Sequence, residues 1–220
     1  MSQTEGAEKP GTRAEMREET ERLILDAAER VFADSGFGGA TMQAIAEACA
    51  LPKANLHYYF SSKEKLYRQV VERIFTVWLE AADSFETSAS PEVALRRYIT
   101  RKMQLSREYR HGSKVWANEV MHGAPIIQDY LEITLRDWTE SRVAVIRRWV
   151  DAGDIQPVDP RWLLYMIWAT TQHYADFAHQ IETLNNGPMS DAQWQEATGT
   201  VCAIILRGIG LDAGDAVAET

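Results

Sequence analysis

The stretch Thr41–Tyr67, TMQAIAEACALPKANLHYYFSSKEKLY, decides how the chain folds. Its first apolar residues recur at helical spacing: Ala44, Ile45 and Ala48. This pattern predicts a short amphipathic helix with Thr41 as its N-cap. Pro52 predicts the start of a second short helix, because its fixed φ suits a first helical turn. Ser61 and Glu64 have the spacing of a capping box and predict the start of a third helix.

The second of these helices, Lys53–Tyr59, carries an unusually polar set of side chains. Two short helices joined by a tight turn, the second one polar, are typical of a helix-turn-helix whose second helix enters the DNA major groove. Tyr58 and Lys63 are expected to contact phosphate, whereas Tyr59 is left open as a core residue. The predicted DNA-contacting residues are Thr41, Lys53, Ala54, Asn55, His57, Tyr58 and Lys63. For Asn55 and His57 the alternative is an ordinary surface position.

The same residues resemble a known family. The runs T-x-x-x-I-A, K-x-N-L-x-Y-Y-F and S-K-E-x-L-Y are similar to the N-terminal domain of TetR-type transcriptional repressors. Two positions depart from that pattern. Ala50 stands where the family usually has a turn glycine, which would cost about 1 kcal/mol in a left-handed conformation. Pro52 replaces a hydroxyl-bearing cap, so that hydroxyl contact is lost.

The rest of the chain predicts an all-α protein of about nine helices. We expect a disordered arm over 1–14, a helix-turn-helix domain over 15–61, a ligand-binding and dimerisation domain over 62–210, and a flexible tail over 211–220. One helix, from Ser62 to about Phe85, belongs to both domains. A long helix from Pro125 to Val150 is also predicted.

Two C-terminal helices predict a homodimer. The segment 161–181 is apolar on almost every side, and the helix from about Asp191 to Arg207 adds more apolar surface. Surplus apolar surface on neighbouring helices favours a four-helix interface with a second copy. A dimer also matches a palindromic operator, whose half-sites lie about one helical turn apart.

Charge and composition narrow the function further. The net charge is −9, but residues 51–70 hold four Lys or Arg side chains against one Glu, a local sum of +3 that suits one DNA-facing surface. The two cysteines are expected to be buried free thiols. We expect no membrane span, no signal peptide, and therefore a cytoplasmic protein. Neither a catalytic motif nor metal-ligand spacing among the five histidines is visible, so no enzyme, metal or cofactor is expected.

Aromatic residues suggest a pocket for a small planar molecule. Gln172 lies four residues after Trp168 in an otherwise apolar run, so both occupy one helix face. A buried amide needs partners, and its donor and acceptor match the edge of a planar amide or imide. The predicted pocket residues are Trp78, Trp116, Tyr165, Trp168 and Gln172. For any one of these aromatic side chains, a position in the core is the more common alternative.

A closer resemblance concerns the ligand. The segments S-R-E-Y, G-A-P-I-I and M-I-W-A-T-T-Q-H-Y-A-D-F-A are similar to pyrimidine-utilisation regulators of the RutR type. That resemblance implies a repressor that senses uracil or thymine, with Trp78, Trp168 and Gln172 in the pocket. The expected mechanism is a population shift in which the ligand moves the helix bearing Trp78 and re-spaces the DNA-contacting helices. Two alternatives stay open: a multidrug-type regulator with a lipophilic ligand, and an all-α ligand-binding protein that acts through another protein.

Overall fold

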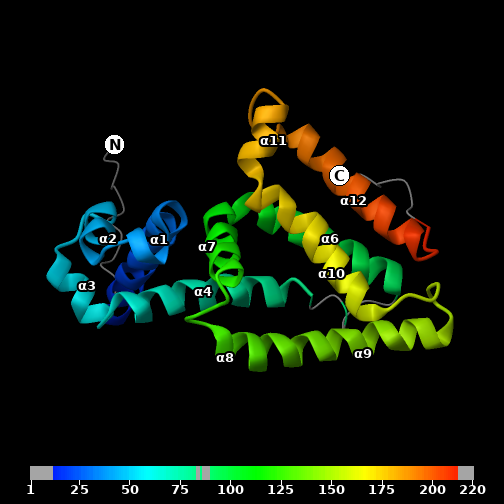
Figure 1. Ribbon diagram of the computed structural model, residues 1–220, viewed down its shortest axis with the longest axis horizontal. Helices are drawn as coiled ribbons and strands as arrows, with labels where there is room; N and C mark the ends of the chain where they lie inside the picture. Colours follow the sequence, from blue (N-terminus) through cyan, green and yellow to red (C-terminus); the bar gives the residue numbers. More distant parts are fainter. Residues whose placement is uncertain (1–11, 83–84, 86–89, 213–220) are drawn as a thin grey trace, which may run out of the picture. The chain divides into compact units, whose positions relative to one another are not determined.

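The computed structural model describes residues 12–82, 85 and 90–212 (Figure 1). This part of the chain contains helices and connecting turns and no β-strand, so the all-α prediction is confirmed. The chain divides into two compact units, with the boundary between Val70 and Val71. Each unit has its own buried core.

The first unit consists of α1 (Arg13–Gly39), α2 (Met42–Ala48), α3 (Lys53–Tyr59) and the beginning of α4 (Lys63–Glu80). α1 begins at Arg13 because Thr12 and Glu15 form a capping box. The helix therefore starts inside the arm predicted over 1–14, of which 1–11 lie outside the described residues. Gly36, at φ +65°, interrupts the helical backbone of α1, a conformation that glycine adopts readily.

The core of the first unit joins all four helices. Its fully buried side chains include Ile24, Ala27, Ala28, Ile45, Leu56 and Leu66. The ring of Tyr67 on α4 lies edge-on to Phe32 at 4.8 Å and to Phe37 at 5.0 Å between centroids. The first two turns of α4 thus pack with α1, which explains why the unit extends beyond the predicted boundary at residue 61.

The cap of α4 differs from the prediction. The backbone N–H of Lys65 donates to the Oγ of Ser62, 3.2 Å away, so Ser62 occupies the N-cap position. The predicted capping box between Ser61 and Glu64 is therefore wrong by one residue. Two adjacent serines have equal capping propensity, and the sequence alone does not choose between them. α4 also ends at Glu80, earlier than the predicted end near Phe85.

The second unit is built around α6 (Pro91–Glu108), which contacts α7 (Arg110–Met121), α10 (Pro160–Asp176) and α12 (Asp191–Gly208). The side chains of α6 that face this core are Ala94, Leu95, Tyr98, Ile99, Met103 and Leu105. The remaining elements are α8 (Gln128–Tyr130), the π-helix η1 (Leu131–Leu135), α9 (Arg136–Ala152) and α11 (Ala178–Leu184). Figure 1 shows α6 and α10 crossing within this unit.

One long helix of the prediction is divided in the structure, and another begins later than predicted. The helix expected over 161–181 leaves helical geometry at Phe177, which separates α10 from α11. The helix expected from Pro125 begins only at Gln128, because Ala124 has φ +53° and the chain turns there. Hydrophobic periodicity does not register either interruption.

The π-helix η1 brings Tyr130 and Leu135 to the same side of the helical segment. These two residues are five apart in sequence. A regular α-helix would place them on different faces, whereas a π-helical turn closes over five residues. The Tyr130 ring packs edge-on against Phe75 at 4.9 Å, and Leu135 and Phe75 line the same cavity. The wider π-helical turn therefore allows both Tyr130 and Leu135 to pack on the side of the cavity that Phe75 forms.

α10 and α12 carry large apolar side chains on their outer surfaces as well as in the core. Leu163, Leu164 and Ile167 of α10 are buried, yet Trp162 is 63% exposed and Met166 is 57% exposed. α12 contacts α10 and presents Ile204, which is 67% exposed. Lone exposed apolar residues are common, but several on two contacting helices form a candidate interaction surface.

Candidate functional site

α3 presents its polar side chains to solvent and anchors itself with apolar ones. Leu56 is 0% exposed and Phe60, directly after the helix, is 2% exposed. The predicted contact residues Lys53, Ala54, Asn55, His57 and Tyr58 are all exposed. Tyr58 is 71% exposed, and Tyr59 is only half-buried. The apolar side of α3 is therefore anchored in the core of the first unit, and its polar side is exposed. Such an exposed polar side is available to contact another molecule.

The turn before α3 contains Ala50 and Pro52, the two residues that depart from the TetR-type pattern. Ala50 lies at φ +52°, the left-handed region that disfavours any side chain with a Cβ. Pro52 is the N-cap of α3 and makes no side-chain capping hydrogen bond. The Leu51 backbone N–H donates to the Ala46 carbonyl at 3.0 Å and helps to hold the turn. The alanine thus adopts the strained geometry without a glycine's freedom.

Thr41 and Lys63 already have partners within the first unit. The Thr41 hydroxyl accepts from the Ala44 backbone N–H at 3.0 Å and caps α2, as predicted. The Lys63 ammonium donates to the carbonyls of Phe37 and Ala40, at 2.6 and 2.9 Å, and lies over the Phe37 ring. Lys63 therefore fixes the α1–α2 connection to α4, and two of its three donor hydrogens are occupied.

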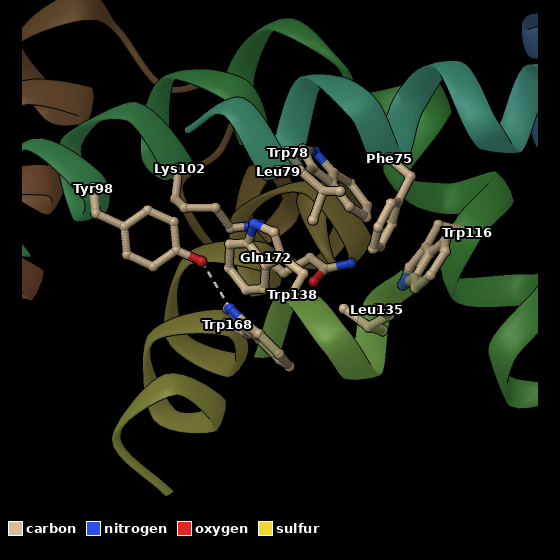
Figure 2. Close-up of a pocket in the computed structure, with 10 residues that line it drawn as sticks. All are labelled: Phe75, Trp78, Leu79, Tyr98, Lys102, Trp116, Leu135, Trp138, Trp168 and Gln172. Carbon is tan, nitrogen blue, oxygen red and sulfur yellow. Dashed lines mark hydrogen bonds between the residues drawn. The ribbon is translucent and has the colours of Figure 1, made fainter. Parts of the chain in front are cut away.

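The second unit contains a partly open cavity, whose empty space together with the solvent at its mouth is about 380 Å³ (Figure 2). Its lining comes from α4, α6, α7, η1, α9 and α10: Phe75, Trp78, Leu79, Tyr98, Lys102, Trp116, Leu135, Trp138, Trp168 and Gln172. Four of the five predicted pocket residues are among them. The exception is Tyr165, which lies on α10 outside the lining, 40% exposed, with its ring 5.3 Å from that of Trp168.

Aromatic rings form most of the pocket wall. Trp116 stacks on Phe75 at 5.0 Å and meets Trp78 edge-on at 5.7 Å. The indole N–H of Trp168 donates to the Tyr98 hydroxyl at 2.8 Å, drawn as the dashed line in Figure 2. Burial raises the pKa of Tyr98 far above its usual value, so the phenol stays neutral. Rigid flat faces of this kind suit a planar ligand.

The polar groups of the pocket are few and point inward. Figure 2 shows the amide of Gln172 and the ammonium of Lys102 extending into the space between the aromatic rings. Lys102 is 4% exposed, and its Nζ lies 4.6 Å from the centroid of the Trp78 ring. Burial lowers the pKa of Lys102 to about 8, and the nearby negative charge of Asp176 only partly offsets that effect.

Asp176, the carboxylate that acts on Lys102, is half-buried and held by a hydrogen bond. The Ser113 hydroxyl donates to its Oδ1 at 2.5 Å. Desolvation raises the pKa of the Asp176 carboxyl, against the lowering effects of Ser113, Lys102 and His173. A second charged group, Arg142, is 8% exposed and lies over the Trp138 ring at 5.5 Å.

Sequence reasoning missed Lys102, the most unusual of the lining residues. A signal was present: Tyr98, Lys102 and Ser106 follow one another at intervals of four, on the buried side of α6. A lysine inside such an apolar stripe is rare in a core. Trp138 and Leu135 gave no comparable signal, because they reach the pocket from a distant part of the chain.

Sequence comparison supplies the family. Residues 71–212 match the model of the YcdC-like protein C-terminal region, and residues 24–70 match that of bacterial regulatory proteins of the tetR family. The chain is also 38% identical over 208 residues to the HTH-type transcriptional regulator RutR of Escherichia coli, covering 94% of this chain and 98% of RutR.

The chain belongs to the TetR family. It is therefore a DNA-binding transcriptional regulator, and α2 and α3 are its helix-turn-helix.

Solved structures of the TetR family share its fold. PfmR, a TetR family regulator from Thermus thermophilus, aligns with a TM-score of 0.68 at 22% identity, covering 86% of this chain and 96% of PfmR. AibR in complex with isovaleryl coenzyme A and operator DNA aligns with a TM-score of 0.66 at 20% identity, covering 84% and 96% of the two chains. Among the described residues, no helix is long and apolar enough to cross a membrane.

Proposed function

We propose that this chain is a homodimeric repressor that binds a palindromic operator and responds to a small planar pyrimidine such as uracil or thymine. The observation that carries the ligand assignment is the Gln172 amide inside a cavity walled by indole rings. An amide side chain offers a donor beside an acceptor, the complement of an imide edge. The similarity to RutR over most of the chain supports the same ligand class.

The buried charge of the pocket favours a polar ligand over a lipophilic one. A long lipophile would meet a buried ammonium at Lys102, whose desolvation it could not compensate. This feature supports a compact polar ring over the multidrug-type alternative.

DNA binding is assigned to the exposed face of α3 and its surroundings. Lys53 and Tyr58 are suited to phosphate, while Asn55 and His57 can form hydrogen bonds with base edges in the major groove. Thr41 and Lys63, beside them in sequence at the starts of α2 and α4, are proposed as phosphate contacts through their remaining donor hydrogens. Because operator DNA is the partner, we place the protein in the cytoplasm.

The exposed apolar side chains of α10 and α12 are proposed as the homodimer interface. Trp162, Met166 and Ile204 would be buried by the same helices of a second copy, in a four-helix arrangement. Two copies would present two α3 helices to successive half-sites.

The proposed response to ligand uses α4. Tyr67 of this helix packs with α1, and Phe75, Trp78 and Leu79 of the same helix line the pocket. A ligand that stabilises one position of Trp78 would therefore bias one position of the helix that begins beside the DNA-contacting residues. The shift requires the ligand to bind one arrangement more tightly than the other.

Two experiments test the proposal. In a mobility-shift assay, the protein should bind the DNA upstream of its own gene, and failure there would favour the all-α protein that acts through another protein. In a thermal unfolding assay, uracil or thymine should raise the melting temperature, with about 2.7 kcal/mol of stabilisation at a ligand concentration of 100 times Kd. Gln172→Ala should lose most of that shift. A shift from an unrelated lipophile instead would point to the multidrug-type regulator.

A further inference from the structure

Lys102 is a buried cation that forms no hydrogen bond within the part of the chain that the structure describes. It is 96% buried, since its exposed fraction is 4%, and it extends into the pocket (Figure 2). Among the described residues its ammonium takes part in no hydrogen bond or salt bridge, and its near neighbour is the face of the Trp78 ring. A buried ammonium normally has a carboxylate or several acceptors, because desolvation without them is costly.

Charged groups on three helices surround the pocket. On α6 the group is Lys102 itself, beside the neutral Tyr98. On α9, Arg142 lies over Trp138 and acts electrostatically on Tyr98. On α10, Asp176 is the acidic group that acts on Lys102, but its Oδ1 accepts from Ser113 and it does not line the cavity. His173 lies on the same helix, is exposed, and acts on Asp176.

We propose that the pocket binds its ligand as an anion, through an ion pair between Lys102 and an ionised imide edge of a planar ring. This deepens the proposed function and rests on it. When the imide ionises, its proton leaves to solvent, and the negative charge is shared by the nitrogen and the adjoining carbonyl oxygens. The ammonium keeps its three hydrogens and donates to one of these atoms. The Gln172 amide holds the rest of the edge, and the indole faces hold the ring.

The ligand class that follows is narrower than pyrimidines in general. Ring compounds whose imide N–H is more acidic should bind more tightly, because a larger fraction is ionised at neutral pH. Uracil, 5-fluorouracil and 5-nitrouracil form such a series, with increasingly acidic imide protons on one ring. Thymine is the control for a substituent at the same ring position, since its methyl group does not make the imide more acidic.

The test measures the affinity of the four compounds by quenching of tryptophan fluorescence at pH 7. Hydrogen bonds to charged groups are worth about 1.5–3 kcal/mol, so 5-nitrouracil should bind about ten- to hundredfold more tightly than uracil. Its affinity should fall as the pH rises above about 8, where Lys102 loses its proton. Lys102→Met should bind the four compounds about equally.

The control variant is Lys114→Met, which removes one exposed lysine of α7 and leaves the pocket intact. It should retain the preference for 5-nitrouracil. The proposal is overturned if all four compounds bind the wild type equally, or if Lys102→Met keeps the preference. If none of the compounds binds the wild type, the proposed pyrimidine effector fails as well. Circular dichroism of both variants verifies that they are folded.

Discussion

Replacing Lys102 with methionine should make the ligand-free protein more stable. The methionine side chain is similar in length to that of lysine, can occupy the same space beside the Trp78 ring, and carries no charge. Replacing a buried charge by an apolar side chain of similar volume is often neutral or stabilising. The substitution thus separates what the ammonium does for ligand binding from what it does to folding.

The magnitude follows from the pKa of Lys102. In the folded state that pKa falls from 10.5 to about 8. Since one pH unit is worth about 1.4 kcal/mol, burying the ammonium costs about 3 kcal/mol when both states are protonated. The cation–π contact with Trp78 returns about 1–2 kcal/mol. The net gain for Lys102→Met is therefore about 1–2 kcal/mol, or roughly 2–8 °C in melting temperature for a chain of this size.

The pH dependence has a definite sign. The unfolded chain keeps its lysine proton up to about pH 10.5, whereas the folded protein releases it near pH 8. The free energy of unfolding of the wild type should therefore increase as the pH rises from about 8 to 10.5, because Lys102 becomes neutral in the folded protein. The advantage of the methionine variant is full below pH 8 and shrinks as the pH rises beyond it.

Tryptophan fluorescence provides the assay. All seven tryptophans lie after Val70, so thermal unfolding followed by fluorescence reports the second unit. Lys114→Met serves again as the matched control and should change the melting temperature little, because surface substitutions are usually within about 0.5 kcal/mol. A lower melting temperature for Lys102→Met at pH 7, or an advantage that grows above pH 8, would refute the reasoning.

Three further predictions concern the other parts of the molecule. Lys53→Ala should weaken operator binding at every salt concentration and reduce the slope of log K against log salt by about 1. Fluorescence anisotropy measures both quantities, and an unchanged slope would contradict a phosphate contact. Ala50→Gly should stabilise the first unit by about 1 kcal/mol, because it removes the strain of an alanine in the left-handed region; hydrogen exchange of α2 and α3 measures this. Ala48→Gly, within α2, should destabilise the same unit. Ile204→Glu should shift the protein towards monomer in sedimentation, while Gln195→Glu, on the opposite side of α12, should leave the dimer intact.

The helix-turn-helix could be predicted well because its signals are local. The cap at Thr41, the break before Pro52 and the polar character of Lys53–Tyr59 each depend on neighbouring residues. The sequence marked Ala50 as a departure from the usual turn glycine, and the structure shows that its backbone is left-handed. The start of α4 could not be assigned to the correct serine, since Ser61 and Ser62 differ only in the geometry of the turn.

The pocket could be predicted only in part. Trp168 and Gln172 share a helix face, and that spacing is visible in the sequence. Trp138 and Leu135 reach the cavity through packing between distant segments, which no local pattern encodes. Tyr165 illustrates the limit: it is near Trp168 in sequence and in space, yet the helix turns it away from the lining.

The five-residue turn of η1 has a consequence for changes in chain length. In a regular α-helix, residues four apart share a face. Deleting one residue within η1 would leave Tyr130 and Leu135 four apart, so an α-helix would still keep them on the same side. A one-residue deletion there should be accommodated by conversion to ordinary helix. The same deletion in the middle of α9 would rotate one half of that helix against the other by about 100°. Length variation among related regulators is thus expected to collect at this short segment and to leave the wall of the cavity in place.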